Sequence, residues 1–298
     1  MLKKFKTAII IGIPFLIPIF FYTDPAHGSQ CPRYEIKATI DTQQKKITAH
    51  QLTTFTNNGL QEIRELYFHI YPNRKYTARE VNFILRFAGY FKENPFPQGY
   101  HATPMDIRNV SAQNKALNFV IEGQDKTLLK IILDRPLNAG ESVAVSMDFS
   151  VDIPHAYGRF GWNENTIQIS RWYPILAVYT EKGWDQNPFY PFHRPFFSES
   201  ADYSVELTVP QNQVIIHSGK QTRENLGGDM KTVTLESGLP IRDFTLAMSP
   251  DYRLVEEEDQ GIKIKSFYLP GDEFYGKEAL QDVKGLMHYY TQRFGKYP

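Results

Sequence analysis

The chain has 298 residues, of which 33 are Lys or Arg and 33 are Asp or Glu, so its formal net charge at pH 7 is zero. The chain also has no block of basic residues, so it lacks the positive charge that binds the phosphates of nucleic acid. We therefore exclude nucleic acid as a partner. Aromatic residues make up 14% of the chain, enough apolar surface to build a folded core. The single cysteine, Cys31, excludes an internal disulfide framework and a zinc site made of several cysteines.

The first thirty residues have the pattern of an export signal. Three lysines among the first six residues precede an apolar run over residues 8–22, and small residues follow, with Ala26 and Gly28 suited to the −3 and −1 positions of a cleavage site. Alternatives are an uncleaved membrane anchor through residues 8–22, lipid attachment at Cys31, or a buried core helix. We expect residues 1–30 to be a signal peptide or membrane anchor that places the body outside the cytoplasmic membrane.

After Arg33, apolar and polar residues alternate, which predicts β-strands. In residues 143–153 the odd-numbered side chains are apolar and most of the others are polar, as in a half-buried antiparallel strand. We expect further strands at residues 34–41, 46–56, 65–71, 117–121, 127–133, 203–209, 213–218, 231–236, 243–248 and 262–268. Turn-forming residues separate them, so the chain is predicted to be mainly β, as a β-sandwich or a large folded antiparallel sheet.

Three segments depart from this alternation. Residues 85–105 contain several prolines and glycines among aromatic residues, which predicts a long packed loop, and the prolines of residues 171–197 exclude a regular helix there. Toward the end of the chain, apolar residues recur at spacings of three and four: Leu280, Val283, Met287, Tyr290 and Phe294. This period predicts one amphipathic helix over residues 273–294, ending at Gly295.

No sequence motif for self-contained catalysis is present. His-Glu-x-x-His, Gly-x-Ser-x-Gly and both glycine-rich phosphate-binding patterns are absent, and the eight histidines are scattered. The acidic run from Glu256 to Asp259 precedes a glycine turn and lacks the alternate spacing of calcium ligands. We interpret it as the solvated end of a hairpin.

Five large aromatic residues lie close together in the sequence: Trp162, Trp172, Tyr173, Tyr179 and Trp184. On a β-sandwich such residues either fill the core or form a surface on which sugars or extended peptides stack. The second arrangement would make the chain an extracytoplasmic binding module for peptide or carbohydrate, which we keep as the alternative function.

Seven segments carry a family resemblance in a fixed order: YEIKATID (34–41), LYFHIYPN (66–73), DIPHAYGRFG (152–161), RWYPILAVYTEKGW (171–184), FFSESADYSVELTVP (196–210), IRDFTLAMS (241–249) and YYTQRFGKYP (289–298). Together they resemble the N-terminal region of the membrane alanyl aminopeptidase (aminopeptidase N) family of zinc metallopeptidases. The resemblance implies a saddle-like β domain that packs on a thermolysin-like catalytic domain. In the family, this domain shapes the side from which substrate enters and helps to hold the peptide's α-amine.

The resemblance also implies a domain organisation. Residues 31–269 correspond to the aminopeptidase N-terminal-like β domain, and residues 270–298 to the first helix of a catalytic domain, whose zinc motif would follow Pro298. We therefore expect a truncated chain without zinc, inactive alone, whose partner is a zinc-bearing catalytic domain or neighbouring polypeptide. Without that domain, Leu280, Val283, Met287 and Tyr290 are expected to be partly exposed.

One candidate site residue follows from the resemblance. Gln168 lies near the position where family members place a glutamine or glutamate against the substrate amine. The alternative is that Gln168 is an ordinary strand residue. No residue of the chain matches the family's zinc ligands or general base, so we expect no catalytic or metal-binding residue here.

Overall fold

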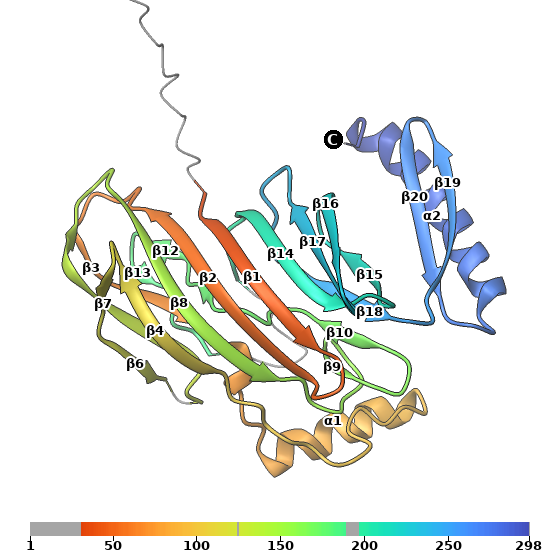
Figure 1. The fold of residues 1–298 in the computed structure, drawn as a ribbon, viewed down its shortest axis with the longest axis horizontal. Helices are drawn as coiled ribbons and strands as arrows, with labels where there is room; N and C mark the ends of the chain where they lie inside the picture. The colour runs from red at the N-terminus through yellow and green to blue at the C-terminus, as the bar shows by residue number, and fades with distance from the viewer. Residues whose placement is uncertain (1–30, 124, 189–196, 298) are drawn as a thin grey trace, which may run out of the picture. The chain divides into compact units, whose positions relative to one another are not determined.

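The computed structural model describes residues 31–123, 125–188 and 197–297. The predicted signal or anchor of residues 1–30 lies outside the described residues. The described chain is mainly β, with several antiparallel sheets and a helix near its C-terminal end, which confirms the predicted fold class (Figure 1).

The largest sheet has eight strands in the order β16-β17-β14-β1-β2-β8-β4-β5. These strands are β1 (Arg33–Asp41), β2 (Lys46–Thr56), β4 (Asp106–Ala112), β5 (Lys115–Ala116), β8 (Ser142–Asp152), β14 (Asp202–Pro210), β16 (Lys220–Gly227) and β17 (Met230–Glu236). β1 and β14 run parallel, and every other pairing in this sheet is antiparallel. Alternate residues of β8 are buried as predicted, because successive side chains point to opposite faces.

Two smaller sheets have four strands each. One has the order β15-β18-β10-β9 and the other β11-β3-β7-β6. Their strands are β3 (Ile63–His69), β6 (Phe119–Glu122), β7 (Leu128–Leu137), β9 (Phe160–Trp162), β10 (Ile167–Ile169), β11 (Ile175–Leu176), β15 (Val214–His217) and β18 (Leu246–Ser249). Two hairpins complete the strands: β12 (Tyr179–Thr180) with β13 (Gly183–Trp184), and β19 (Arg253–Asp259) with β20 (Ile262–Tyr268).

One continuous core joins the large sheet to both four-stranded sheets. Trp172 and Tyr173 lie in it with no exposed surface, so they cannot form the stacking surface of the alternative function. The indole Nε1 of Trp172 donates to the Phe244 carbonyl at 3.0 Å, and the Tyr173 hydroxyl donates to that of Tyr203 at 2.8 Å. These bonds satisfy polar atoms that burial has removed from water.

Two helices lie among the described strands, and the first was not predicted. Helix α1 (Ala78–Tyr90) occupies the start of the segment 85–105 that was expected to be a loop, so that expectation is wrong for residues 85–90. Thr77 and Glu80 form a capping box in which each side chain satisfies a backbone N–H at the helix start. The glycines and prolines after the helix determine where it ends, but they do not prevent the helix from forming.

The second helix, α2 (Glu273–Phe294), has the predicted bounds and packs on the β19–β20 hairpin. Leu280 is only 1% exposed on this side, so the expectation that it would be partly exposed is wrong. Two polar pairs also join α2 to β19 of the hairpin. Glu257 contacts Lys284 at 3.1 Å, and Asp259 contacts His288 at 2.6 Å. Leu280 is buried because α2 packs on the hairpin, and the polar pairs lie at the same contact.

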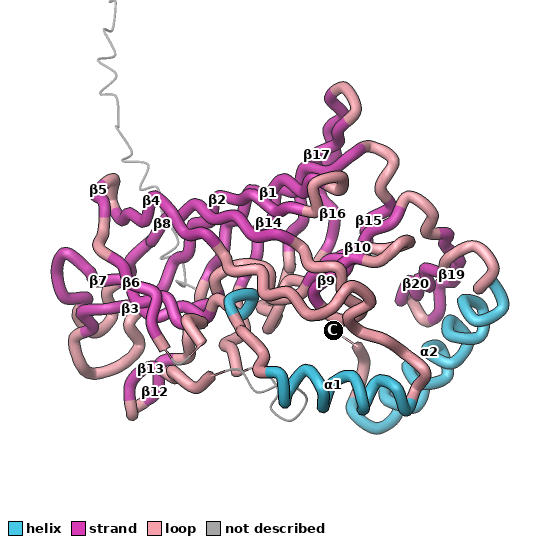
Figure 2. The backbone as a smooth tube through the Cα atoms, turned by 90° about the horizontal axis from the view of Figure 1, so that it is seen from below, coloured by secondary structure: helices cyan, strands magenta, loops and turns pink. Residues whose placement is uncertain are grey.

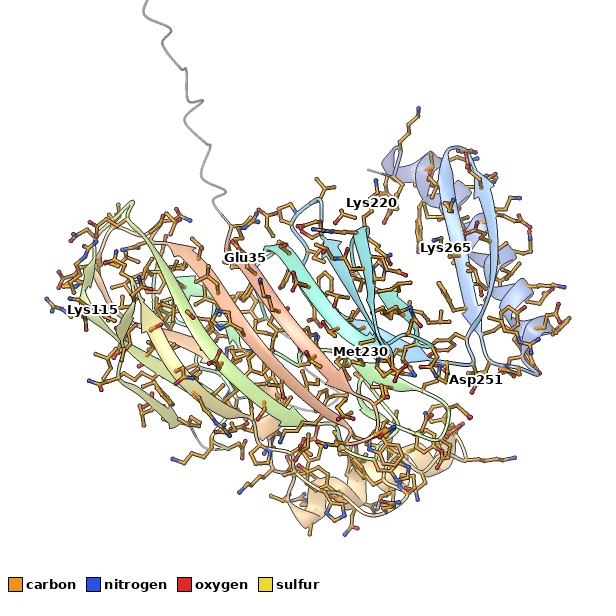
Figure 3. All side chains as sticks on the ribbon, in the orientation of Figure 1. Glu35, Lys115, Lys220, Met230, Asp251 and Lys265 are labelled. Carbon is orange, nitrogen blue, oxygen red and sulfur yellow. The ribbon has the colours of Figure 1, made fainter. Side chains whose placement is uncertain are left out.

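The acidic run forms the end of this hairpin, as interpreted from the sequence. Glu256 and Glu258 are exposed on β19, immediately before the turn at Gln260 and Gly261. Lys265 on β20, labelled in Figure 3, lies 3.9 Å from the Glu256 carboxylate. An exposed pair at this distance contributes little stability, so the run is a solvated strand end.

Candidate functional site

A cavity of about 1090 Å³ is lined by residues of helix α1, of the loop that follows it and of the β9–β10 strand pair. Figure 2 shows the backbone of these elements. Aromatic residues form much of the helix side, and polar residues much of the strand side. Its volume is that of a pocket for a small molecule or a short peptide. The cavity is the candidate functional site.

Short contacts anchor the start of α1 at the cavity. The Arg74 guanidinium lies 2.6 Å from Glu80 and 2.7 Å from Asp125. Although burial raises the pKa of the Glu80 carboxyl, hydrogen bonds from Thr77 and the charge of Arg74 leave that pKa below its ordinary value. Glu80 therefore stays ionised at neutral pH, where it both caps the helix and holds Arg74.

The loop that follows α1 is held by hydrogen bonds at Pro95 and Tyr100. The Tyr100 hydroxyl donates to the Arg74 carbonyl at 2.6 Å and accepts from the Tyr76 N–H at 3.1 Å. Further along the same wall, the Tyr157 N–H donates to the Pro95 carbonyl at 3.0 Å. The bond between Tyr157 and Pro95 joins the helix side of the cavity to the strand side.

The strand side depends on one glycine. A Cβ at Gly161 would lie 2.2 Å from the Ala156 carbonyl oxygen, closer than any real contact. The loop before β9 folds back here, with the Ala156 N–H donating to Trp162 at 3.2 Å and the Trp162 N–H donating to Pro154 at 2.9 Å. Glycine is thus required for the approach of this loop to the strand.

Gln168 lies on β10 and lines the cavity. Its neighbours Ile167 and Ile169 are buried, and alternation along the strand turns the Gln168 side chain to the opposite, exposed face. The structure therefore places the predicted substrate-binding residue in the cavity wall. Its role toward a substrate amine stays a prediction.

Two arginines, Arg159 and Arg171, line the same cavity as Gln168. Burial lowers the pKa of the Arg171 guanidinium to about 10, and the nearby Asp243 carboxylate opposes this effect. Burial likewise raises the pKa of Asp243, and the charge of Arg171 opposes that rise. Neither arginine is marked in the sequence as a site residue, since neither belongs to a catalytic or ligand-binding motif.

His155 is the histidine most enclosed by the cavity wall. Its ring stacks on Trp162 with centroids 4.2 Å apart, and its side chain is 10% exposed. Nε2 lies 3.5 Å from a Glu164 carboxylate oxygen, but neither ring nitrogen has hydrogen-bond geometry with a described residue. The ring contributes a flat surface next to the polar wall.

No group of three or more His, Cys, Asp or Glu side chains within residues 31–123, 125–188 and 197–297 is arranged to hold a metal ion. In the same ranges, neither helix combines the length and apolar composition needed to cross a bilayer. The described lining of the cavity offers aromatic, amide and guanidinium groups.

The comparisons with known proteins identify the fold. No protein-family profile matches the sequence, and no curated protein matches it. An M1 zinc metallopeptidase from Deinococcus radiodurans, solved as a glutamate-to-alanine mutant with the substrate Tyr-Ser-Ala, is 13% identical with a TM-score of 0.52, covering 90% of this chain and 55% of its own. A two-domain M1 zinc metallopeptidase bound to L-arginine is 12% identical with a TM-score of 0.51, with the same coverage.

At this identity the similarity shows the fold alone. The chain spans about half the length of these solved structures, at 55% of each. The architecture of this β-rich chain is thus shared with part of an M1 zinc metallopeptidase. Activity, substrate and partner do not follow from the fold by itself.

Proposed function

We propose that the chain is the noncatalytic N-terminal portion of a zinc aminopeptidase-like protein, with residues 31–269 as its β domain. It shapes the side from which substrate enters and packs on a zinc-bearing catalytic domain carried outside residues 1–298. The observation that carries this proposal is the fold similarity over 90% of the chain to a substrate-bound M1 zinc metallopeptidase. The ordered series of family-like segments supports it.

Helix α2 supports the existence of a catalytic partner. On the side away from the hairpin, Val283, Leu286 and Tyr290 are 42%, 51% and 51% exposed. Full burial of such a side chain contributes about 1.5–3 kcal/mol, so a row of them favours contact with another surface. In the proposal, residues 270–298 are the first helix of the catalytic domain and this row packs inside it.

The cavity supports a role in substrate access. Gln168 offers an amide oxygen that accepts a hydrogen bond from a peptide N–H and an amide nitrogen that donates to a peptide carbonyl. We propose that Gln168 contacts the bound peptide, so that Gln168→Ala in the complete enzyme raises KM with little change in kcat. An unchanged KM would remove Gln168 from the site.

The test is to pair this chain with the polypeptide that carries the zinc motif. That polypeptide is found by reading the coding sequence beyond residue 298 and the neighbouring reading frames for His-Glu-x-x-His. We expect the joined or mixed pair to release alanine from an alanyl chromogenic substrate, and this chain alone to release none. Stoichiometric zinc with amino-acid release from the chain alone would contradict the proposal, as would a pair that does not associate.

We also propose an extracytoplasmic location, directed by the signal-like residues 1–30. N-terminal sequencing of the protein isolated from its native cells distinguishes the forms. A mature chain that starts at Ser29 indicates cleavage after Gly28, whereas an intact chain in the membrane fraction indicates an anchor through residues 8–22. Recovery of the intact chain in the cytosol would contradict this location.

A further inference from the structure

Among the charged side chains that line the cavity, the positive ones outnumber the negative ones. Arg74 is already neutralised, because Glu80 and Asp125 both contact its guanidinium. The charged side chains lining the cavity within the described residues are Arg74, Glu93, Arg159 and Arg171. The remaining three carry one negative and two positive charges.

Arg159 is the cation without a counterion. No ion pair and no hydrogen bond joins its exposed side chain to another described residue, and Glu93, although it lines the same cavity, does not pair with it. The charge of Arg171 interacts with that of the Asp243 carboxylate, which does not line the cavity. The two arginines are close enough to repel each other, since the charge of Arg159 lowers the pKa of Arg171. One negative charge placed beside them would relieve this repulsion.

The backbone holds Arg171 in an uncommon conformation. Its φ is 53°, in the left-handed region that a side chain rarely adopts outside turns. The neighbouring strand residue Ile169 and the next residue Trp172 are fully enclosed, and the Ser170 N–H donates to the Arg159 carbonyl at 2.8 Å. The fold thus fixes the backbones of both arginines relative to each other, and local strain of this kind is concentrated at binding sites.

The aromatic side chains of the cavity are accessible. Phe87 and Phe91 of the α1 region are 50% and 60% exposed, and Tyr157, two residues before Arg159 on the strand side, is 41% exposed. All three line the cavity. A ligand that fits both walls has one anionic end and an apolar or aromatic group.

We propose that this cavity binds the carboxyl end of a short peptide, with the carboxylate beside Arg159 and Arg171 and the apolar side chains against Phe87, Phe91 and Tyr157. The peptide identity of the ligand rests on the proposed function, whereas recognition of the carboxylate rests on the cavity alone. Guanidinium groups bind carboxylates through paired, charge-assisted hydrogen bonds.

The charge balance selects a carboxylate over two other groups. A peptide α-amine would add a third positive charge beside two guanidiniums, which like-charge repulsion opposes. A phosphate monoester carries nearly two negative charges at neutral pH, but only Arg159 lacks a counterion among the described cavity residues. The amides of Asn163 and Gln168 nearby suit the neutral peptide groups of the same ligand.

Matched peptides test this assignment in a calorimetric titration of the purified chain without zinc. Tyr-Ser-Ala, Tyr-Ser-Ala amide and N-acetyl-Tyr-Ser-Ala differ only at one end. We expect amidation to weaken binding about tenfold, since hydrogen bonds to a charged group are strong, and acetylation to change it less than about threefold. Phenylpropionate and adenosine monophosphate, the other sources of an anion with an aromatic group, should bind more weakly than Tyr-Ser-Ala.

A variant assigns the effect to the cavity. Arg159→Gln is expected to remove the difference between acid and amide, because the exposed side chain takes part in the carboxylate contact and not in folding. The matched control is Arg223→Gln, on the exposed strand β16 and outside the cavity, which should keep the tenfold difference. Circular dichroism checks that both variants fold.

Each other outcome overturns the proposal. Equal binding of acid and amide removes carboxylate recognition, and a large loss on acetylation shows that the cavity holds the amine instead. Tighter binding of phenylpropionate or adenosine monophosphate, or binding of no peptide, removes the peptide ligand. Because the titration needs neither zinc nor the catalytic polypeptide, its failure is separate from failure of the paired activity assay.

Discussion

Tyr173 is the hydrogen-bonding centre of the buried aromatic cluster. Its hydroxyl donates to Tyr203 at 2.8 Å, accepts from the Phe244 N–H at 3.3 Å, and lies 3.3 Å from the Asp243 carboxylate. The ring stands edge-on to that of Tyr203, with centroids 5.8 Å apart. One buried hydroxyl therefore joins β14 to the chain around residue 244.

Tyr173→Phe tests the importance of this hydroxyl. The change leaves the Phe244 N–H and the Tyr203 hydroxyl without a partner, so we expect the free energy of unfolding to fall by about 1–3 kcal/mol. Urea denaturation measures the loss. Tyr275→Phe is the control, because Tyr275 is 69% exposed on α2 and should leave stability unchanged. Equal stability of both variants would contradict the role of the cluster.

Asp243 predicts how stability changes with pH. Burial raises its pKa in the folded chain, so the unfolded chain loses this proton at a lower pH than the folded chain does. The contribution of Asp243 to the free energy of unfolding is largest below the ordinary carboxyl pKa. It falls as the pH rises through the raised pKa of the folded chain.

The measurement is urea unfolding of the native chain and the Asp243→Asn variant between about pH 4 and pH 7, the range above the ordinary aspartate pKa. Asn cannot ionise, so the native chain should lose stability relative to the variant as the pH rises. A stability difference that is independent of pH, or that changes in the native chain's favour, would show that Asp243 ionises at least as easily in the folded chain as in the unfolded one.

At the scale of elements, helix α1 shows where the sequence analysis was incomplete. The residues Thr77 and Glu80 have the spacing of a capping box, and Val81, Ile84 and Ala88 follow at helical spacing. That signal was available in the sequence. The glycines and prolines after residue 88 led to the prediction of a loop, although they determine where the helix ends and not whether it starts.

Strand β16 has no comparable signal. All eight of its residues, Lys220–Gly227, are exposed, so no alternation of apolar and polar residues marks it. It is a strand because β17 presents a free edge with which its backbone pairs. Only the arrangement of the neighbouring strands reveals this kind of element.

Two glycines of α2 make a matched pair for testing the contact of α2 with its hairpin. A Cβ at Gly276 would lie 2.5 Å from the ring of Tyr268 on β20, whereas a Cβ at Gly285 would meet nothing within 4 Å. Gly276 is buried and Gly285 is exposed. The two substitutions to alanine therefore differ in contact but not in helix propensity.

We expect Gly285→Ala to stabilise α2 by up to about 1 kcal/mol, because alanine favours a helix over glycine. Gly276→Ala should instead displace Tyr268 and reduce the protection of α2 backbone amides from hydrogen exchange. Mass-spectrometric exchange on the two variants gives the comparison. If both variants gain protection equally, α2 does not rest on β20.

At the scale of the whole molecule, the exposed row of α2 predicts association. Replacing Leu286, which is 51% exposed there, by serine should weaken binding of the zinc-bearing polypeptide about tenfold, since an apolar contact is lost. Leu226→Ser on β16 is the control, at 64% exposed. Equal dissociation constants for the two variants, measured by surface plasmon resonance, would show that this row is not the contact surface.

The amino-acid sequence by itself determined the strands in which apolar and polar residues alternate, and the last helix. Alternation in residues such as Ile36 and Phe149, and the spacing of Leu280, Val283 and Met287, are local consequences of how side chains project from a strand or a helix. The position of Gln168 on a strand follows from the same rule. Which residues surround Gln168 in space does not follow from that rule.

Only the tertiary structure brought the cavity together. Phe87, Arg159 and Arg171 come from separate parts of the chain, and no sequence spacing relates them. The same holds for Leu280, whose burial depends on a hairpin that packs against α2. A periodic pattern shows which face of an element is apolar, but what covers that face, and which charges meet in a pocket, depends on the packing of elements distant in sequence.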